Sequence, residues 1–352
     1  MKMLNITENT KIYVYCPAGV VTGGVELLHQ LVDILNKCGR DAYVCYLGDK
    51  PHECPSEYSS YNLKFASSVE DEACNIAVYF DSGFSQAFEL KNIQKVLWWM
   101  SVDNLFRNEC LKLSFTDMYL FDKKFAIVSF LRKAKQLLKG RNIFRKGFSI
   151  QGLIGLDIVA AYQSEYARDF LEKKGFKKIA PLKDYINTEH RLQGDNVTNR
   201  ESRVLYNPKK GFEYTKQLMK IAPELNWIPI QNMTRNELIS LMRTSKLYID
   251  FGNHPGKDRL PREAALNGCC IITGRRGSAN FYGDIAIPNK YKFDESIADK
   301  SRVVETIEDV VNNYETVIHD FDDYVSNILK EENEFYNQVY DLFQITANEI
   351  SC

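Results

Sequence analysis

The stretch 246–278 constrains the fold most, because apolar runs and glycine-rich loops alternate along it in a fixed order. Residues 246–251 (KLYIDF) have the β-branched and aromatic composition of a buried strand. Two glycines and a proline exclude a helix in 252–258, and a short helix is then predicted up to Gly268. A second apolar run, 269–273 (CCIIT), completes the order of strand, loop, helix and strand that is typical of parallel α/β sheets.

Charged loops follow both of these strands, and parallel sheets bind their ligands at the carboxyl ends of strands. A glycine-rich backbone, a helix N-terminus and guanidinium groups all favour a phosphate or a diphosphate. The carboxylates of Asp258 and Glu263 suit sugar hydroxyls, because an ionised carboxylate accepts hydrogen bonds. The pattern predicts a nucleotide-sugar site; the alternative is a solvated basic loop beside an ordinary helix. The cations of the two loops are Lys257, Arg259, Arg262, Arg275 and Arg276.

The first half of the chain opens with the same theme. A strand over 11–16 is followed by a glycine-rich turn (17–24), a periodic helix (25–39) and a second strand (41–47), which predicts a doubly wound domain. The turn lacks the G-x-G-x-x-G spacing, so a nicotinamide cofactor is weakly supported. Its glycines allow a ligand or a facing domain to approach, and a tight turn without a ligand is the alternative. The glycines concerned are Gly23 and Gly24.

Two further strands of the first half, within 75–83 and 95–104, end in polar residues. Among these, Asp103 is the strongest candidate for a catalytic carboxylate at this edge of the sheet. The alternative is that it caps the N-terminus of the following helix.

The second half repeats the strand, basic glycine loop and helix over 203–223. The loop at this strand's carboxyl end contains two lysines that suit a phosphate. Its candidate residues are Asn207, Lys209, Lys210 and Gly211.

The length of 352 residues is sufficient for two domains. We expect an N-terminal α/β domain over 1–187, a polar linker over 188–202 and a second α/β domain over 203–315. Residues 316–352 are predicted to contain one long acidic helix.

A formal net charge of -1 argues against nucleic acid as a partner. The nine cysteines form no C-x-x-C pair, and several lie in apolar strands, which is typical of free thiols in a reducing compartment. The chain shows no signal peptide and no apolar run of about 20 residues, so we expect a cytoplasmic protein. The five histidines show no metal-ligand spacing, and no metal site is predicted.

A basic segment occupies 123–156, which contains nine Lys or Arg residues and no acid. Within it, 125–139 favours an amphipathic helix. We expect 123–146 to contact an anionic membrane surface peripherally, at its inner face; a solvated helix is the alternative.

Four motifs carry a resemblance to a known family: GGVE (23–26), NPKKG (207–211), PREAALNG (261–268) and GRRGS (274–278). Together they resemble a nucleotide-sugar glycosyltransferase of the GT-B fold, similar to bacterial enzymes that build capsule or lipopolysaccharide. The resemblance implies two Rossmann-like domains facing across a cleft, with the donor mainly on the second and the acceptor on the first. It also implies that the last helix crosses back to the first domain and that no metal or other cofactor is needed.

The resemblance assigns roles to individual residues. Lys209 or Lys210 corresponds to a phosphate-binding lysine beside Gly211, and Glu263 to the glutamate that binds the ribose. The loop of Gly274, Arg275, Gly277 and Ser278 corresponds to a segment near the diphosphate, and Gly23 and Gly24 to a turn near the donor. The chain departs from the family where retaining members carry another glutamate, because Pro255 stands there; the nearest acid is Asp258.

The expected activity is transfer of a sugar from a nucleoside diphosphate to a hydroxyl of a glycan or lipid-linked acceptor in surface polysaccharide synthesis. Lys209 and Lys210, with Arg259 or Arg262, would stabilise the leaving diphosphate. Inverting chemistry requires a base, for which Asp103 is the candidate, whereas in retaining chemistry Asp103 positions the acceptor. The alternatives are a nucleotide-sugar epimerase on the same fold and a non-catalytic nucleotide- or glycan-binding protein.

Overall fold

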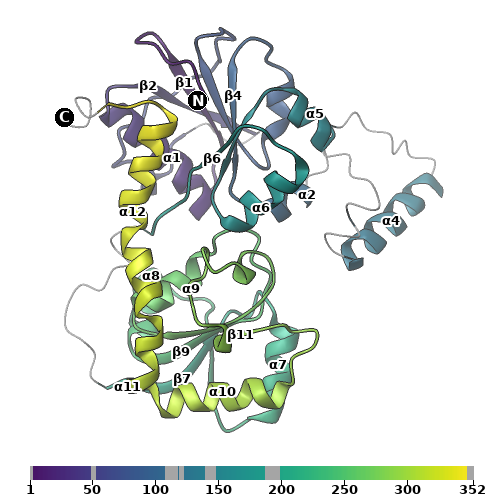
Figure 1. The fold of residues 1–352 in the computed structure, drawn as a ribbon, viewed down its shortest axis with the longest axis vertical. Helices are drawn as coiled ribbons and strands as arrows, with labels where there is room; N and C mark the ends of the chain where they lie inside the picture. The colour runs from purple at the N-terminus through teal and green to yellow at the C-terminus, as the bar shows by residue number, and fades with distance from the viewer. Residues whose placement is uncertain are drawn as a thin grey trace. The chain divides into compact units, whose positions relative to one another are not determined.

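The computed structural model describes residues 3–48, 53–107, 118, 123–138, 148–186 and 199–346. The chain divides into two compact units, each an α/β sheet with helices (Figure 1). The first unit contains Met1–Gln163, Ala167–Leu182 and Gln338–Cys352. The second contains Ser164–Tyr166 and Lys183–Asn337.

The first unit is built on six parallel strands in the order β2-β1-β3-β4-β5-β6. Its interior strands are almost fully buried, as expected for a sheet covered on both faces. The strands are β1 (Lys11–Pro17), β2 (Asp41–Leu47), β3 (Ile76–Phe80), β4 (Gln94–Trp99), β5 (Val159–Tyr162) and β6 (Ile179–Pro181). The helices are α1 (Gly23–Lys37), α2 (Val102–Arg107), α4 (Lys123–Leu138), α5 (Ile150–Gly155) and α6 (Glu165–Lys174), with 3-10 turns η1 (Ser56–Tyr58) and η2 (Phe84–Phe88).

The second unit has five parallel strands in the order β11-β10-β9-β7-β8. The strands are β7 (Glu201–Tyr206), β8 (Asn226–Pro229), β9 (Ser245–Asp250), β10 (Cys270–Gly274) and β11 (Lys292–Phe293). The helices are α7 (Phe212–Ile221), α8 (Arg235–Arg243), α9 (Arg259–Leu266), α10 (Lys300–Asn312), α11 (Tyr314–Val317) and α12 (Asp322–Leu342). The 3-10 turns are η4 (Ser278–Asn280), η5 (Asn289–Tyr291) and η6 (Ile318–Phe321). Two sheets of parallel strands with interleaved helices confirm the predicted α/β class.

The strand–helix–strand block of 246–273 forms β9, α9 and β10, so this prediction is confirmed to within a few residues. Pro261 lies in the first turn of α9, where its missing N–H leaves no helical hydrogen bond unmade. Gly268 has a φ of 81°, the left-handed conformation that ends a helix. The β9 and β10 strands are buried in the core of the second unit.

The prediction of one continuous helix from residue 316 is wrong. The chain forms α11, then the 3-10 turn η6, and only then α12. The ring of Phe321 in η6 is 1% exposed and stacks on Tyr291 at 4.9 Å between centroids. Asp320 accepts hydrogen bonds from Tyr291 Oη at 2.5 Å and Lys290 Nζ at 2.8 Å. These contacts stabilise the 3-10 turn η6, which is tighter than a turn of α-helix.

Most of the expected linker lies outside the described residues, at 188–198. Its predicted end at 202 is too late, because β7 already begins at Glu201. The helix α12 starts in the second unit, and its residues from Gln338 onward group with the first. Among the described residues, none of the helices combines the length and apolar character that crossing a membrane requires.

Candidate functional site

Three loops meet at the carboxyl edge of the second sheet. They cover 207–211, 251–258 and 274–278, and they follow β7, β9 and β10, which are neighbours in the sheet (Figure 1). Carboxyl edges of parallel sheets are where α/β proteins bind ligands. The structure thus brings together the loops that the sequence named as candidates.

Two glycines allow these loops to approach one another. Gly211 has a φ of 64°, and a Cβ at this position would overlap the carbonyl group of Phe251. Gly277 has a φ of 62°, and a Cβ there would overlap the carbonyl oxygen of His254. Both positions require glycine for its backbone conformation and for its lack of a side chain. The backbones of the three loops therefore pack directly on each other.

The β7 loop presents its two lysines differently. Asn207 shapes the turn, because its Oδ1 accepts from Lys209 N at 3.0 Å. The Lys209 side chain is exposed, as expected for a group that meets a ligand. Lys210 Nζ instead lies 2.6 Å from Asp258 Oδ2, where Asp258 is the N-cap residue of α9. The Lys210 ammonium is therefore already paired with a carboxylate of the neighbouring loop.

His254 completes a buried charged cluster beside this pair. Its Nδ1 lies 3.1 Å from Asp258 Oδ2, and its Nε2 lies 3.6 Å from Asp250 Oδ1. Burial lowers the pKa of His254, but Asp250 and Asp258 outweigh burial and raise it above 6.5. Burial likewise raises the pKa of Asp258, but His254 and Lys210 hold it below 3.8. The cluster favours an imidazolium between two carboxylates.

Asp250, His254 and Asp258 are close enough to be considered as metal ligands. Within the described residues, one ligand atom from each lies within 4.8 Å of the other two. The sequence did not predict this group, although His254 stands four residues from both Asp250 and Asp258. The two ring nitrogens face different carboxylates, and a single ion can bind only one nitrogen of a ring. The geometry therefore fits ion pairing better than a metal.

The prediction that Arg262 binds phosphate is corrected by its burial. The side chain is 0% exposed, and its NH1 and NH2 lie 2.8 Å from Glu331 Oε2 and 2.7 Å from Asp184 Oδ2. Lys257 Nζ lies 2.6 Å from the other oxygen of Glu331. Burial raises the pKa of Asp184, but Arg262 and Lys257 bring it below 3.8. Arg262 is the centre of an internal ionic cluster and presents no donor to a ligand.

Ser278 is corrected for the same reason. Its backbone N–H donates to His254 O at 2.9 Å, and its Oγ donates to Gly256 O at 2.6 Å. The residue is 0% exposed. Ser278 therefore holds the β9 and β10 loops together, and its side chain does not reach a phosphate.

Arg259 and Glu263 lie one turn apart on α9. Arg259 Nε is 3.7 Å from Glu263 Oε1, and the Glu263 side chain is 8% exposed. The Arg259 side chain, at 24% exposed, is the more accessible of the two. Both residues lie in α9; Glu263 was expected in this helix, whereas Arg259 was expected in the loop before it.

A pocket of about 580 Å³ lies at the same edge of the second sheet. A Cβ at Gly274 would come within 2.5 Å of Glu295 Oε1, so this side chain would have to move to admit one. Burial raises the pKa of Glu295 to about 7, although Arg276 lowers it. Arg275 donates to Lys292 O at 3.2 Å and to Asn289 Oδ1 at 3.1 Å, so its guanidinium is partly engaged. The lining residues are Glu213, Tyr214, Gln217, Arg275, Arg276, Asp294, Glu295 and Ser296.

The candidates of the first unit lie at the carboxyl edge of its own sheet. Gly23 and Gly24 form the first turn of α1, and a Cβ on Gly24 would contact Met100 Sδ at 3.8 Å. Asp103 is the second residue of α2 and is 1% exposed, so its carboxylate is buried. Asp81 accepts from Ser101 N at 2.7 Å, and burial raises its pKa to about 6.

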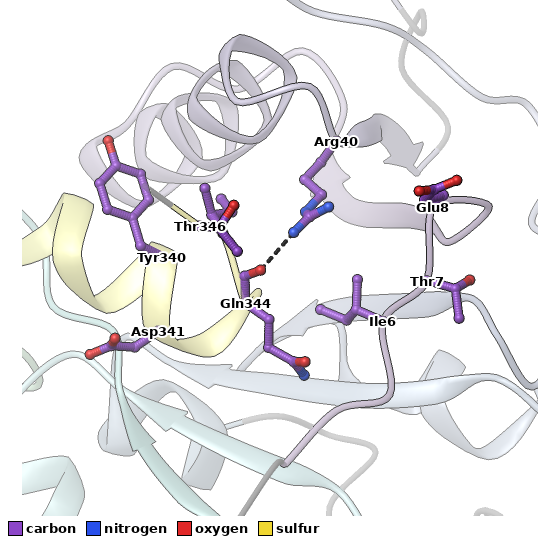
Figure 2. A pocket seen from close by; sticks show the side chains of 9 residues that line it. Ile6, Thr7, Glu8, Arg40, Tyr340, Asp341, Gln344 and Thr346 are labelled. Atoms are coloured by element: carbon purple, nitrogen blue, oxygen red, sulfur yellow. Dashed lines mark hydrogen bonds between the residues drawn. The ribbon is translucent and has the colours of Figure 1, made fainter. Parts of the chain in front are cut away.

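A second pocket, of about 510 Å³, lies at the opposite edge of the first sheet (Figure 2). Its walls include residues before β1 and the start of β2, where the strands begin. Arg40 donates to Gln344 O at 2.7 Å across it (Figure 2). Ligands of α/β sheets bind at the other strand ends, so this pocket is not the candidate site. The lining residues are Ile6, Thr7, Glu8, Arg40, Tyr340, Asp341, Gln344, Ile345 and Thr346.

Comparison with known proteins gives a clear result for the fold. No family model and no curated protein sequence matches the chain. Sucrose-phosphate synthase from Thermosynechococcus elongatus is similar in structure, with a TM-score of 0.59, 11% identity, and 96% of this chain and 98% of that chain covered. WaaG, a glycosyltransferase involved in lipopolysaccharide biosynthesis, has a TM-score of 0.52 and 11% identity over 96% of this chain and 100% of that one.

TarM is a third similar structure, with a TM-score of 0.52 and 13% identity. The likeness covers 78% of this chain but 56% of TarM, so the chain spans little more than half of that protein's length. At sequence identities of 11–13%, the structural similarity shows a shared fold and nothing further. It agrees with the two sheets of parallel strands described above. The chain has the two-sheet α/β fold of the GT-B glycosyltransferases.

Proposed function

We propose that this protein transfers a sugar from a nucleoside diphosphate to a hydroxyl of a glycan or lipid-linked acceptor in surface polysaccharide synthesis. One observation carries the proposal: the loops 207–211, 251–258 and 274–278 meet at the carboxyl edge of the second sheet with a lysine at their junction. That junction combines glycine backbone, the N-terminus of α9 and cationic side chains, which suits a diphosphate. WaaG, of similar fold, acts in lipopolysaccharide biosynthesis, which supports the polysaccharide role.

The chemistry asked of the site is electrostatic. Negative charge grows on the diphosphate as the bond between the sugar carbon and oxygen breaks. In our proposal Lys209 and Lys210 neutralise this charge, and Arg259 adds a second cation from α9. Glu263 accepts the ribose hydroxyls. Because side chains and the helix N-terminus carry the charge, the proposal requires no metal.

The proposal leaves Asp103 a positioning role. A base must contact the acceptor hydroxyl directly, whereas Asp103, which is 1% exposed in the first turn of α2, acts only through the residues packed around it. Asp258 is the acid nearest to the place where retaining members carry a second glutamate, which is Pro255 here. We propose that Asp258 contacts the sugar once Lys210 has moved to the diphosphate.

The basic helix α4 supports a peripheral contact with an anionic membrane surface. Large apolar side chains are exposed on it, with Ile127 at 50%, Phe130 at 58% and Leu131 at 60%. Arg132 and Lys135 are exposed beside them, which is the composition that binds anionic headgroups. The rest of the predicted segment, 139–146, lies outside the described residues.

Vesicle flotation tests this contact. The chain is expected to float with vesicles that contain phosphatidylglycerol and not with phosphatidylcholine alone. The double variant F130S/L131S is expected to stay in the lower fraction. The variant I297S, which changes another exposed apolar residue (84%), is the control and is expected to bind like the wild type.

Nucleotide binding and turnover test the main proposal. One of a panel of UDP, GDP, ADP and CDP is expected to stabilise the chain against thermal unfolding, with or without a chelator. The K209A/K210A variant should lose this stabilisation and roughly two orders of magnitude of turnover. The variant K216A/K220A removes the same charge from exposed positions of α7 and serves as the control. Normal turnover by K209A/K210A would reject the proposal.

A non-catalytic nucleotide-binding protein is the second candidate, because Pro255 replaces an expected acid. It predicts the same thermal stabilisation without any product from the matching nucleotide-sugar. A product assay with and without glycan acceptors separates the two.

A further inference from the structure

His254 occupies the junction of the three loops of the candidate site. It lies in the loop after β9 and is 0% exposed. Its carbonyl oxygen accepts from Ser278 N at 2.9 Å, and its backbone pairs with Gly277, so it holds the loop after β10. Through Asp258 its side chain also reaches Lys210 in the loop after β7. One buried residue therefore connects all three loops.

The side chain of His254 faces charged groups from two sides. Asp250 lies on the Nε2 side at 3.6 Å, and Asp258 on the Nδ1 side at 3.1 Å. Neither ring nitrogen makes a well-aligned hydrogen bond to any described residue, so these carboxylates are its electrostatic partners. Tyr248 Oη donates to Asp250 at 2.8 Å from β9. Glu295 adds a third, more distant carboxyl group whose pKa responds to His254.

The positive and negative charges of this cluster are equal in number, and a bound diphosphate would change that balance. Asp250 and Asp258 contribute two negative charges, and Lys210 and a protonated His254 contribute two positive ones. If Lys210 moves to a diphosphate, Asp258 loses its nearest cation. A buried carboxylate without a cation is costly, so another positive charge must compensate it.

We propose that His254 is a positioning residue of the donor site, whose imidazolium charge stabilises Asp258 while Lys210 binds a nucleoside diphosphate. The inference rests on the proposed function, since it requires a diphosphate at Lys210. A neutral ring would leave Asp258 dependent on Lys210, and the ligand would then have to break that ion pair without compensation.

The proposal makes diphosphate affinity depend on pH. Although burial lowers the pKa of His254, Asp250 and Asp258 raise it above 6.5, so the ring keeps its proton at pH values where a free imidazole has lost it. We expect the affinity to fall roughly tenfold as pH rises from about 6 to about 9, through the raised pKa of the ring. A purely structural role would not give this profile.

The experiment is calorimetric titration of the full chain with UDP, GDP, ADP or CDP, whichever binds most tightly, across this pH range. Wild type is expected to lose affinity as pH rises. His254→Gln is expected to bind weakly at about pH 7 and to show no further loss, so the two curves converge. His319→Gln is the matched control, because His319 is exposed on η6 and pairs with Asp322. It should follow the wild type.

Each other outcome is decisive. If H254Q falls in parallel with wild type, the role of His254 is overturned while the proposed function stands. If no nucleoside diphosphate binds the folded wild type, the proposed function fails and the inference with it. If EDTA abolishes binding and Mn²⁺ restores it, a metal ion and not the imidazolium offsets the charge, and the inference is overturned. If H254Q does not fold, Asp250→Asn replaces it and should move the loss of affinity to lower pH; an unmoved profile overturns the proposal.

Discussion

Arg262 on α9 and Glu331 on α12 form a buried ion pair, with NH1 of the arginine 2.8 Å from Oε2 of the glutamate across 69 positions of sequence. Lys257 and Asp184 complete the cluster from the β9 loop and from the segment after β6. Apart from the short segment Ser164–Tyr166, the chain changes unit after Leu182, close to Asp184, and after Asn337, which follows Glu331 on α12. The cluster therefore anchors both of these chain segments to the loop and helix of the candidate donor site.

Removing Glu331 should destabilise the second unit. In E331A two buried cations, Arg262 and Lys257, would lose a shared partner. A buried charge left without its partner costs roughly 3–5 kcal/mol, and we expect a loss of this size in the free energy of unfolding. Urea denaturation followed by circular dichroism measures it. The exposed Glu334 on the same helix is the control, since E334A should change stability by less than about 0.5 kcal/mol. A loss below about 1 kcal/mol in E331A would contradict the description of this cluster.

The role of Arg262 shows why the sequence predicted the fold of this region better than its chemistry. The limits of β9, α9 and β10 follow from local signals such as Pro261 and Gly268. The partners of Arg262 lie 69 and 78 positions away, so no local pattern distinguishes it from a phosphate ligand. Arg259, three residues earlier on the same helix, has a more exposed side chain.

The contacts of His254 could not be predicted from the sequence for a different reason. Its spacing of four from Asp250 and from Asp258 is visible in the sequence, but such spacing brings side chains together only in a helix. Here a loop bounded by Gly252 and Gly256 gives the same result by folding back over the end of β9. A loop of this composition has no fixed period, so its contacts could not be predicted.

Stability should depend on pH through Asp284. Burial raises its pKa to about 6, although the N–H groups of Glu165 and Tyr166 lower it. The folded chain then holds this proton more tightly than the unfolded chain, so the contribution of Asp284 to stability falls as pH rises from about 4 to about 6. Compared with D284N, wild type should lose roughly 2 kcal/mol across this window. Urea denaturation at a series of pH values measures the difference.

The exposed Asp323 provides the control for this titration. D323N removes a solvent-exposed carboxylate of α12 and is measured beside D284N under the same conditions. A constant difference between D284N and wild type would show instead that Asp284 titrates normally.

Gly277 is predicted to tolerate no side chain. Its backbone, at φ 62° and ψ −135°, is rare for other residues, and a Cβ would overlap the carbonyl oxygen of His254. G277A should lose at least about 2 kcal/mol of unfolding free energy and weaken nucleoside diphosphate binding, because the β9 and β10 loops must separate. G155A is the matched control, since a Cβ at the exposed end of α5 meets nothing within 4 Å. Equal stability of the two variants would argue against the packing of these loops.

Asp258 is expected to oppose nucleotide binding while supporting turnover. Its carboxylate lies 2.6 Å from Lys210 Nζ, in competition with any phosphate. Since the Lys210 side chain is 35% exposed, removing this ion pair should tighten nucleoside diphosphate binding by only about two- to fivefold in D258N. Turnover should fall, because the proposed sugar contact is lost. D309N, with the same charge change on exposed α10, should alter neither quantity. Weaker binding by D258N would mean that Asp258 assists the diphosphate site rather than competing with it, because Lys210 would then need its carboxylate to stay in place.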